Sequence, residues 1–129
     1  MCVAVLGGGS FGTVIANIVA SNDNRVRLWL RNGERAEGIN RQRQNTEYLP
    51  GYILHEKLEA TASLAHAVSG VDVLFVAVPS SSFRSVVREL AGHVSQHALV
   101  ISLTKGIEPG GFRLMSEILA QEMPANPRG

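Results

Sequence analysis

A glycine-rich turn lies close to the start of the chain, where residues 7–12 match the pattern G-x-G-x-x-G. In this pattern Gly7 suits a tight turn, Gly9 allows the backbone to approach a pyrophosphate, and Gly12 lets a helix pack close to the preceding strand. The N-terminus of that helix presents free N–H groups and partial positive charge to phosphate oxygens. No Lys-Ser or Lys-Thr pair follows the last glycine, which excludes a P-loop. The turn therefore predicts a dinucleotide-binding site.

A basic residue occupies the position where NAD-specific folds carry an acid. In such folds an Asp or Glu about 20 residues further on binds the adenosine ribose. Here Arg31 lies nineteen positions after Gly12 and is followed by Asn32. Arg31 could form charge-assisted hydrogen bonds to a ribose 2′-phosphate, assisted by Arg35 one helical turn later. This favours NADPH over NADH as the cofactor; a solvated basic stretch over residues 25–43 is the alternative interpretation.

Two further segments lie where ligands of parallel sheets bind, beyond the carboxyl ends of predicted strands. Pro79 ends one apolar run, and residues 104–106 follow the next. Lys105 could offer a cation to a substrate phosphate or to a polarised carbonyl, with a plain solvated lysine as the alternative. His93 and His97 have a spacing of i, i+4, but no third ligand lies near them, so no metal site is expected.

These residues need a scaffold, and the apolar pattern predicts alternating strands and helices. Strands are expected at residues 2–6, 25–31, 59–62, 71–78 and 98–103. Helices are expected after the glycine turn, over residues 32–43 and 63–68, from residue 80 onward and near the end of the chain. A long loop is expected over residues 44–58. Alternation of this kind predicts βαβ units, so the expected fold class is α/β: a doubly wound, Rossmann-like parallel sheet.

Particular side chains carry structural expectations of their own. The first helix has an apolar stripe that should face the core, formed by Phe11, Val14, Ile15, Ile18 and Val19. Ser63 and residues 80–82 are predicted N-caps. Trp29 is predicted to pack at the sheet edge, and stacking on an adenine is the alternative.

Length and composition limit the possible functions. The 129 residues allow one domain, 45% of them are apolar, and 12 Lys and Arg against 11 Asp and Glu give a net charge of +1. Aromatic residues make up only 5%, so neither the charge nor the composition favours a nucleic-acid partner. No run approaches the roughly 18–20 apolar residues that span a bilayer. A single cysteine, Cys2, cannot form an internal disulfide. A cytoplasmic location without membrane insertion is expected.

Five segments in sequence order resemble the N-terminal region of NAD(P)-dependent glycerol-3-phosphate dehydrogenase. They are residues 6–13 (LGGGSFGT), 28–31 (LWLR), 45–51 (NTEYLPG), 76–80 (VAVPS) and 104–108 (TKGIE). The third and fifth segments discriminate best, because many dehydrogenases share the other three.

The resemblance implies an enzyme that interconverts dihydroxyacetone phosphate and sn-glycerol 3-phosphate by hydride transfer with NADPH or NADH, for glycerophospholipid synthesis. It also implies that Lys105 contacts both the cofactor and this small phosphate substrate. The predicted cofactor-binding residues are Gly7, Gly9, Ser10, Phe11, Gly12, Arg31, Tyr48, Pro79 and Lys105.

The chain departs from the family pattern at its end. The family's sixth strand and its helical C-terminal domain, which carries the general-base lysine, are missing, so no catalytic residue is expected within residues 1–129. These residues are therefore predicted to be the dinucleotide-binding domain of a longer dehydrogenase, with little turnover of their own and with a possible homodimer formed through the C-terminal domain. The alternatives are the cofactor domain of a ketopantoate reductase or 6-phosphogluconate dehydrogenase relative, and a non-catalytic NAD(P)H-sensing module.

Overall fold

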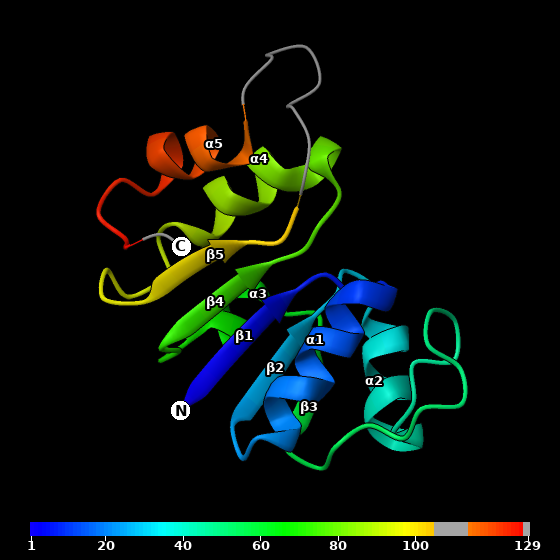
Figure 1. Cartoon of the computed structure of the whole chain (residues 1–129). Coiled ribbons are helices and arrows are strands. Elements are labelled where there is room, and N and C mark those ends of the chain that lie inside the picture. The colour runs from blue at the N-terminus through cyan, green and yellow to red at the C-terminus, as the bar shows by residue number, and fades with distance from the viewer. Residues whose placement is uncertain (105–113, 128–129) are drawn as a thin grey trace.

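Short apolar segments form one parallel sheet in the computed structural model, which describes residues 1–104 and 114–127. The strands are β1 (Cys2–Leu6), β2 (Arg25–Trp29), β3 (Leu58–Thr61), β4 (Val73–Val76) and β5 (Leu99–Ser102). They lie side by side in the order β3-β2-β1-β4-β5, and every neighbouring pair is parallel (Figure 1). This is the strand order of the first five strands of a doubly wound dinucleotide-binding sheet, so the predicted fold class is confirmed.

Helices cover both faces of the sheet. They are α1 (Ser10–Ser21), α2 (Gly33–Gln42), α3 (Leu64–Val68), α4 (Ser80–Leu90) and α5 (Met115–Glu122). Side chains of α1 and α2 share one apolar core with the sheet, and side chains of α3, α4 and α5 share the other (Figure 1). Within the described ranges, none of these helices is long and apolar enough to cross a membrane.

The position of β1 at the centre of the sheet explains why its sequence is apolar without interruption. Ala4 and Leu6 point into the core under α3, α4 and α5, whereas Val3 and Val5 point into the core under α1 and α2. All four side chains are at most 2% exposed, because successive residues of a strand face opposite sides and both sides are covered.

The helix α1 packs differently from the prediction. Its fully buried residues are Gly12, Thr13, Ala16 and Ala20, whereas Phe11 and Ile18 are 58% and 53% exposed. The expected apolar stripe was therefore wrong in part, although Ile15 and Val19 pack at the margin of the core. Small residues at a spacing of four let the helix approach the sheet closely, and this close approach turns the larger side chains away.

Trp29 does not pack at the sheet edge, because β2 lies between β1 and β3. Its ring is 4% exposed, and its indole Nε1 donates a hydrogen bond to the carbonyl oxygen of Ala62 at 3.1 Å. The ring lies in the core that α3, α4 and α5 share with the sheet, and the alternation along β2 does not reveal which helices cover that face.

Helix capping follows the sequence in one of two predicted places. The Ser63 hydroxyl accepts a hydrogen bond from the N–H of His66, as predicted. The predicted cap of α4 was wrong, since α4 begins at Ser80 after Pro79 and has no side-chain cap. Asn32 caps α2 by accepting from the N–H groups of Glu34 and Arg35, which agrees with the general preference for Asn before a helix.

The helices α4 and α5 are joined by a charged cluster. Arg84 donates from Nη1 to Oε1 of Glu122 at 2.8 Å, and Arg88 donates from Nη2 to the same oxygen at 3.0 Å. The hydrogen bond from Arg88 is the main cause that holds the pKa of Glu122 below its ordinary value, and the contacts with Arg84 add to it. The carboxylate therefore stabilises the contact between α4 and α5 in its charged form.

Replacing Glu122 by Gln is expected to destabilise the chain near neutral pH and to matter less in acid. A carboxyl group with a depressed pKa contributes stability above its unfolded pKa, about 4.3 for Glu, and that stability is lost as the pH falls through the folded pKa. Urea unfolding of the parent chain and of Glu122→Gln, from about pH 7 to about pH 3, would measure the difference. A difference in unfolding free energy that does not shrink in acid would contradict this role.

Candidate cofactor site

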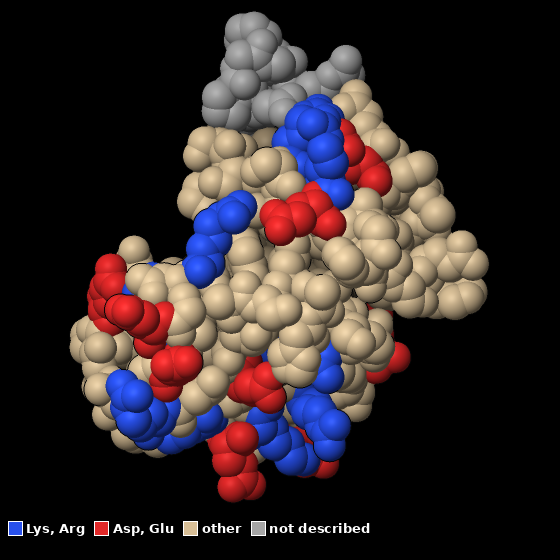
Figure 2. Space-filling model, turned by 180° about the vertical axis from the view of Figure 1, so that it is seen from behind, with Lys and Arg blue, Asp and Glu red and all other residues tan. Residues whose placement is uncertain are grey.

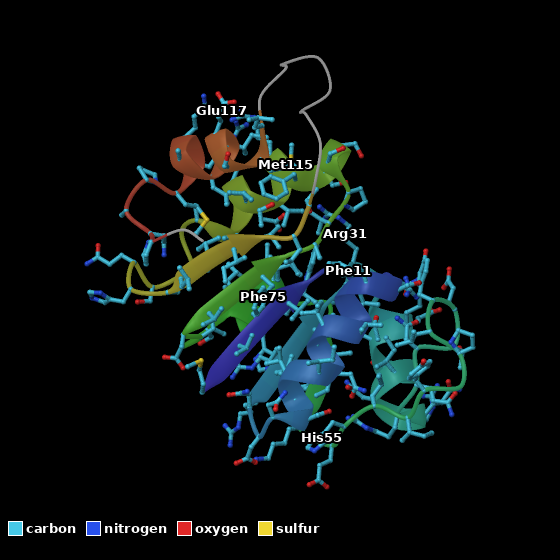
Figure 3. All side chains as sticks on the ribbon, in the orientation of Figure 1. Phe11, Arg31, His55, Phe75, Met115 and Glu117 are labelled. Carbon is cyan, nitrogen blue, oxygen red and sulfur yellow. The ribbon has the colours of Figure 1, made fainter. Side chains whose placement is uncertain are left out.

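A hollow of about 520 Å³ opens at the carboxyl ends of the strands. It is lined by residues 7–9 after β1, 29–31 at the end of β2, 77–79 after β4 and 103–104 after β5. The strand order reverses between β1 and β4, and such switch points are where open α/β sheets bind their ligands. Figure 3 shows Phe11 and Arg31 at this end of the sheet and His55 at the opposite end of the molecule.

Two of the glycines are required by the protein's own backbone. Gly7 has a φ of +124°, and a Cβ there would lie 2.5 Å from the carbonyl oxygen of Ala77. A Cβ at Gly12 would clash with the carbonyl oxygen of Gly7. The turn therefore depends on Gly7 for its shape and on Gly12 for the close contact between α1 and the end of β1.

Gly9 is different, because a Cβ there would meet no atom within 4 Å. Its φ of −76° is open to any residue, so neither strain nor packing requires a glycine. Gly9 precedes α1, which has no side-chain cap and no acidic residue in its first turn. Open space beside an uncapped helix N-terminus is the cradle that a pyrophosphate would fill, so these residues fit a dinucleotide.

Basic side chains lie at the end of the hollow where β2 stops. The guanidinium of Arg31 lies 5.3 Å from the centre of the Trp29 ring, and Arg31 forms no ion pair with any residue that the structure describes. Arg35 is engaged instead: its Nε lies 3.0 Å from the Glu47 carboxylate, and its guanidinium lies 4.6 Å from the centre of the Tyr48 ring. The two arginines are thus not equivalent.

The structure brings together six of the predicted cofactor residues around the hollow: Gly7, Gly9, Phe11, Arg31, Tyr48 and Pro79. Gly12 is buried behind the turn. Ser10 turns its hydroxyl away and donates to the carbonyl oxygen of Tyr48 at 2.6 Å. Lys105 lies outside the described residues.

Thr104 also lines the hollow. From the sequence it was expected only as part of the segment of residues 104–108, with no role of its own. Its Oγ1 donates to the carbonyl oxygen of Val78 at 2.5 Å, and its N-terminal neighbour Leu103 donates its N–H to the carbonyl oxygen of Val76 at 2.8 Å. These bonds tie the end of β5 to the end of β4, so Leu103 and Thr104 line the hollow.

A larger hollow, of about 700 Å³, opens at the opposite end of the strands, near their amino ends. Its charged side chains largely satisfy one another: Asp23 pairs with Lys57, and Glu59 lies 2.6 Å from His66. The hydrogen bond from Lys57 is the main cause that lowers the pKa of Asp23. The smaller hollow is the better candidate, because it combines the switch point, the glycine turn and an uncapped helix.

This fold and this hollow define a Rossmann-like nucleotide-binding domain of the kind that NAD(P)-dependent oxidoreductases use. The family description that matches residues 2–128 is NAD-dependent glycerol-3-phosphate dehydrogenase N-terminus. The match covers nearly the whole chain, and the chain belongs to this family.

Individual relatives agree with the family. The chain is 54% identical over 121 residues to glycerol-3-phosphate dehydrogenase [NAD(P)+] of Teredinibacter turnerae, which covers 94% of this chain and 36% of that protein. It also superposes on the crystal structure of glycerol-3-phosphate dehydrogenase from Coxiella burnetii with a TM-score of 0.92 and 31% identity, over 98% of this chain and 39% of that one. The chain therefore spans about a third of the length of the curated relatives it matches.

The alternative dehydrogenases are not favoured. A ketopantoate reductase from Ralstonia eutropha matches with a TM-score of 0.77 but only 21% identity, over 99% of this chain and 40% of that one, and this likeness extends to the fold alone. The two segments that discriminated best in the sequence, residues 45–51 and 104–108, agree with the family that the comparisons show.

A matched pair of glycine substitutions distinguishes a glycine required for cofactor binding from one required for stability. Gly9→Ala adds a methyl group into open space, so the unfolding free energy should change by less than about 1 kcal/mol while NADPH and NADH binding weakens strongly. Gly12→Ala should instead lower the unfolding free energy by more than about 2 kcal/mol, because its Cβ meets rigid backbone. Urea unfolding and cofactor fluorescence titration measure both. Undiminished binding by Gly9→Ala would exclude a pyrophosphate beside this residue.

Proposed function

We propose that residues 1–129 form the NAD(P)H-binding, N-terminal part of a longer dehydrogenase that interconverts dihydroxyacetone phosphate and sn-glycerol 3-phosphate for glycerophospholipid synthesis. The observation that carries this proposal is the glycine turn, with its open cradle beside Gly9 at the switch point of the sheet. The names of the relatives support the substrate, and the third of their length that the chain spans supports the division into domains.

In the proposed reaction the cofactor supplies the hydride, and the residues of this chain bind the cofactor and the substrate. Reduction adds a hydride from the cofactor to the carbonyl carbon and a proton to the carbonyl oxygen. Residues 7–12 would hold the pyrophosphate, and Arg31 the ribose end. Lys105 would bring a cation to the substrate phosphate and to the nicotinamide end. The proton would come from a general acid outside these residues, so the chain binds and orients rather than completes the reaction.

NADPH is the proposed cofactor, because Arg31 is the cation best placed for a 2′-phosphate. It is exposed, lines the hollow and has no carboxylate partner in residues 1–104 and 114–127. Arg35 contributes less, since the Glu47 carboxylate and the Tyr48 ring already hold its guanidinium. The absence of an acid at the end of β2 removes the group that would bind a ribose 2′-hydroxyl and repel a 2′-phosphate.

Arg31→Ala is expected to raise the dissociation constant for NADPH about tenfold and to leave that for NADH nearly unchanged, since the variant loses charge-assisted hydrogen bonds to the 2′-phosphate. Arg25→Ala is the matched control. It removes the same charge from the amino end of β2, where Arg25 lines the larger hollow and not the proposed cofactor site. Fluorescence titration at constant ionic strength gives the dissociation constants. An equal loss for both cofactors, or the same loss in the control, would contradict the role of Arg31.

The purified 129-residue chain is expected to bind cofactor without measurable reduction of dihydroxyacetone phosphate. A positioned acid contributes a factor of about 10² to 10⁴ in such reactions, and the resemblance places the family's lysine outside these residues. Oxidation of NADPH followed by absorbance, with and without substrate, measures the turnover. Substrate-dependent oxidation by the chain alone would overturn the division of labour proposed here.

The other partners stay predictions of the sequence. On the face that Figure 2 draws, basic and acidic side chains lie next to one another rather than forming a continuous basic surface, which supports a small-molecule partner over a nucleic acid. A cytoplasmic location and a homodimer formed through a C-terminal domain remain expectations. A sensing module would share the cofactor site, so the full-length protein's turnover with dihydroxyacetone phosphate separates that function from the enzyme.

A further inference from the structure

A buried polar pair lies beneath the glycine turn. Thr13 and Asn45 are 0% and 1% exposed, although both side chains are polar. The Nδ2 of Asn45 donates to the carbonyl oxygen of Gly8 at 2.8 Å and to Oγ1 of Thr13 at 2.9 Å. The Thr13 hydroxyl in turn donates to the carbonyl oxygen of Gly9 at 2.7 Å. Asn45 therefore binds the carbonyl of Gly8 directly and reaches that of Gly9 through the Thr13 hydroxyl, beside the helical hydrogen bond that the Thr13 N–H donates to the same Gly9 oxygen at 3.0 Å.

The direction of these carbonyl groups decides which way the turn's N–H groups point. A trans peptide unit is planar, and its C=O and N–H point in opposite directions. The carbonyl of Gly8 shares a peptide unit with the N–H of Gly9, and the carbonyl of Gly9 shares one with the N–H of Ser10. Holding both carbonyls toward Asn45 and Thr13 therefore aims both N–H groups away from these buried side chains, and Gly8 and Gly9 line the hollow.

We propose that Asn45 is a positioning residue for the cofactor: it fixes the peptide unit after Gly8 directly and reinforces the unit after Gly9 through the Thr13 hydroxyl, so that their N–H groups face the pyrophosphate. It acts from beneath the turn through buried hydrogen bonds and does not itself line the hollow. This inference rests on the proposed function, because it requires a dinucleotide at the turn.

The loop that carries Asn45 makes further contacts with the same turn. Ser10 donates its hydroxyl to the carbonyl oxygen of Tyr48 at 2.6 Å. Arg35, whose Nε pairs with Glu47, also donates from Nη2 to the carbonyl oxygen of Gly8 at 3.3 Å. The carbonyl of Gly8 thus accepts from two side chains, so both of its lone pairs are engaged within the protein. A phosphate beside the turn would meet donors and no competing acceptor.

A buried asparagine could instead serve stability alone, and Asn126 provides the matched control. It is 8% exposed, and its Nδ2 also donates two hydrogen bonds, to the carbonyl oxygens of Ser95 at 2.8 Å and Ala98 at 3.1 Å. These acceptors lie in the connection between α4 and β5, which does not line the hollow. Both Asn45→Ala and Asn126→Ala remove two buried donors without adding a charge.

The experiment compares cofactor affinity with stability in the 129-residue chain. Fluorescence titration gives dissociation constants for NADPH and NADH, and urea unfolding without cofactor gives the stability of each variant. Asn45→Ala is expected to raise both dissociation constants about tenfold and by the same factor, because the two cofactors share the pyrophosphate. Asn126→Ala should leave both within about twofold at a comparable loss of stability.

Three outcomes would overturn the proposal. In the first, Asn45→Ala raises the dissociation constants no more than Asn126→Ala does. In the second, Asn45→Ala weakens the binding of NADPH alone. In the third, Asn45→Asp loses affinity and Asn45→Ala does not, which would show charge repulsion rather than positioning. If the parent chain binds neither cofactor, the proposed function itself fails; if the parent binds and Asn45→Ala binds equally well, only this inference fails.

A second residue keeps the test decisive if Asn45→Ala does not fold. Thr13→Val removes the hydroxyl, which both receives the hydrogen bond from Asn45 and donates to the carbonyl of Gly9, and keeps the backbone N–H bond to that carbonyl and the size of the side chain, so both dissociation constants should rise. Thr13→Ser retains the hydroxyl and should restore binding close to that of the parent. Equal affinity of the Val and Ser variants would contradict the proposed role of the hydrogen bond.

Discussion

The contact between the start of α1 and the end of β1 is the constraint on which the rest of the structure depends. At Gly12 the helix lies so close to the Gly7 carbonyl that no side chain fits between them. The same approach continues along α1 through Ala16 and Ala20, which are fully buried against the sheet. A helix held this close to the central strand directs its N-terminus at the switch point. The cradle beside Gly9 is therefore a consequence of how tightly two backbones pack.

A second layer of contacts turns this geometry into a specific site. The loop between α2 and β3 is long and has little regular structure, yet it reaches the glycine turn through Asn45 and through the backbone of Tyr48. Arg35 links the same loop to α2 by its ion pair with Glu47. Polar groups that would be costly to bury alone are satisfied by one another in this arrangement. The loop thereby serves the turn as well as connecting two elements.

Much of the fold could be predicted because its signals are local. Strands covered on both faces read as continuous apolar runs, and each of the ten elements was expected near its observed place. The glycine turn could be located because its spacing is tied to a strand before it and a helix after it. The errors concern side chains whose exposure depends on elements that pack against them in the folded chain. The exposure of Phe11 follows from the closeness of α1, and the burial of Trp29 follows from its place in the core under α3, α4 and α5.

What the sequence determined by itself is the class of site: a glycine turn, a basic residue at the end of the second strand and two discriminating segments that led to the right family. What only the tertiary structure decided is how individual side chains are used. Ser10 bonds the loop rather than facing the hollow, Arg35 is held by a carboxylate, and Asn45 lies beneath a turn more than thirty residues away in the chain. Spacing along the chain encodes local geometry, whereas hydrogen bonds between distant segments exist only once the sheet has brought those segments together.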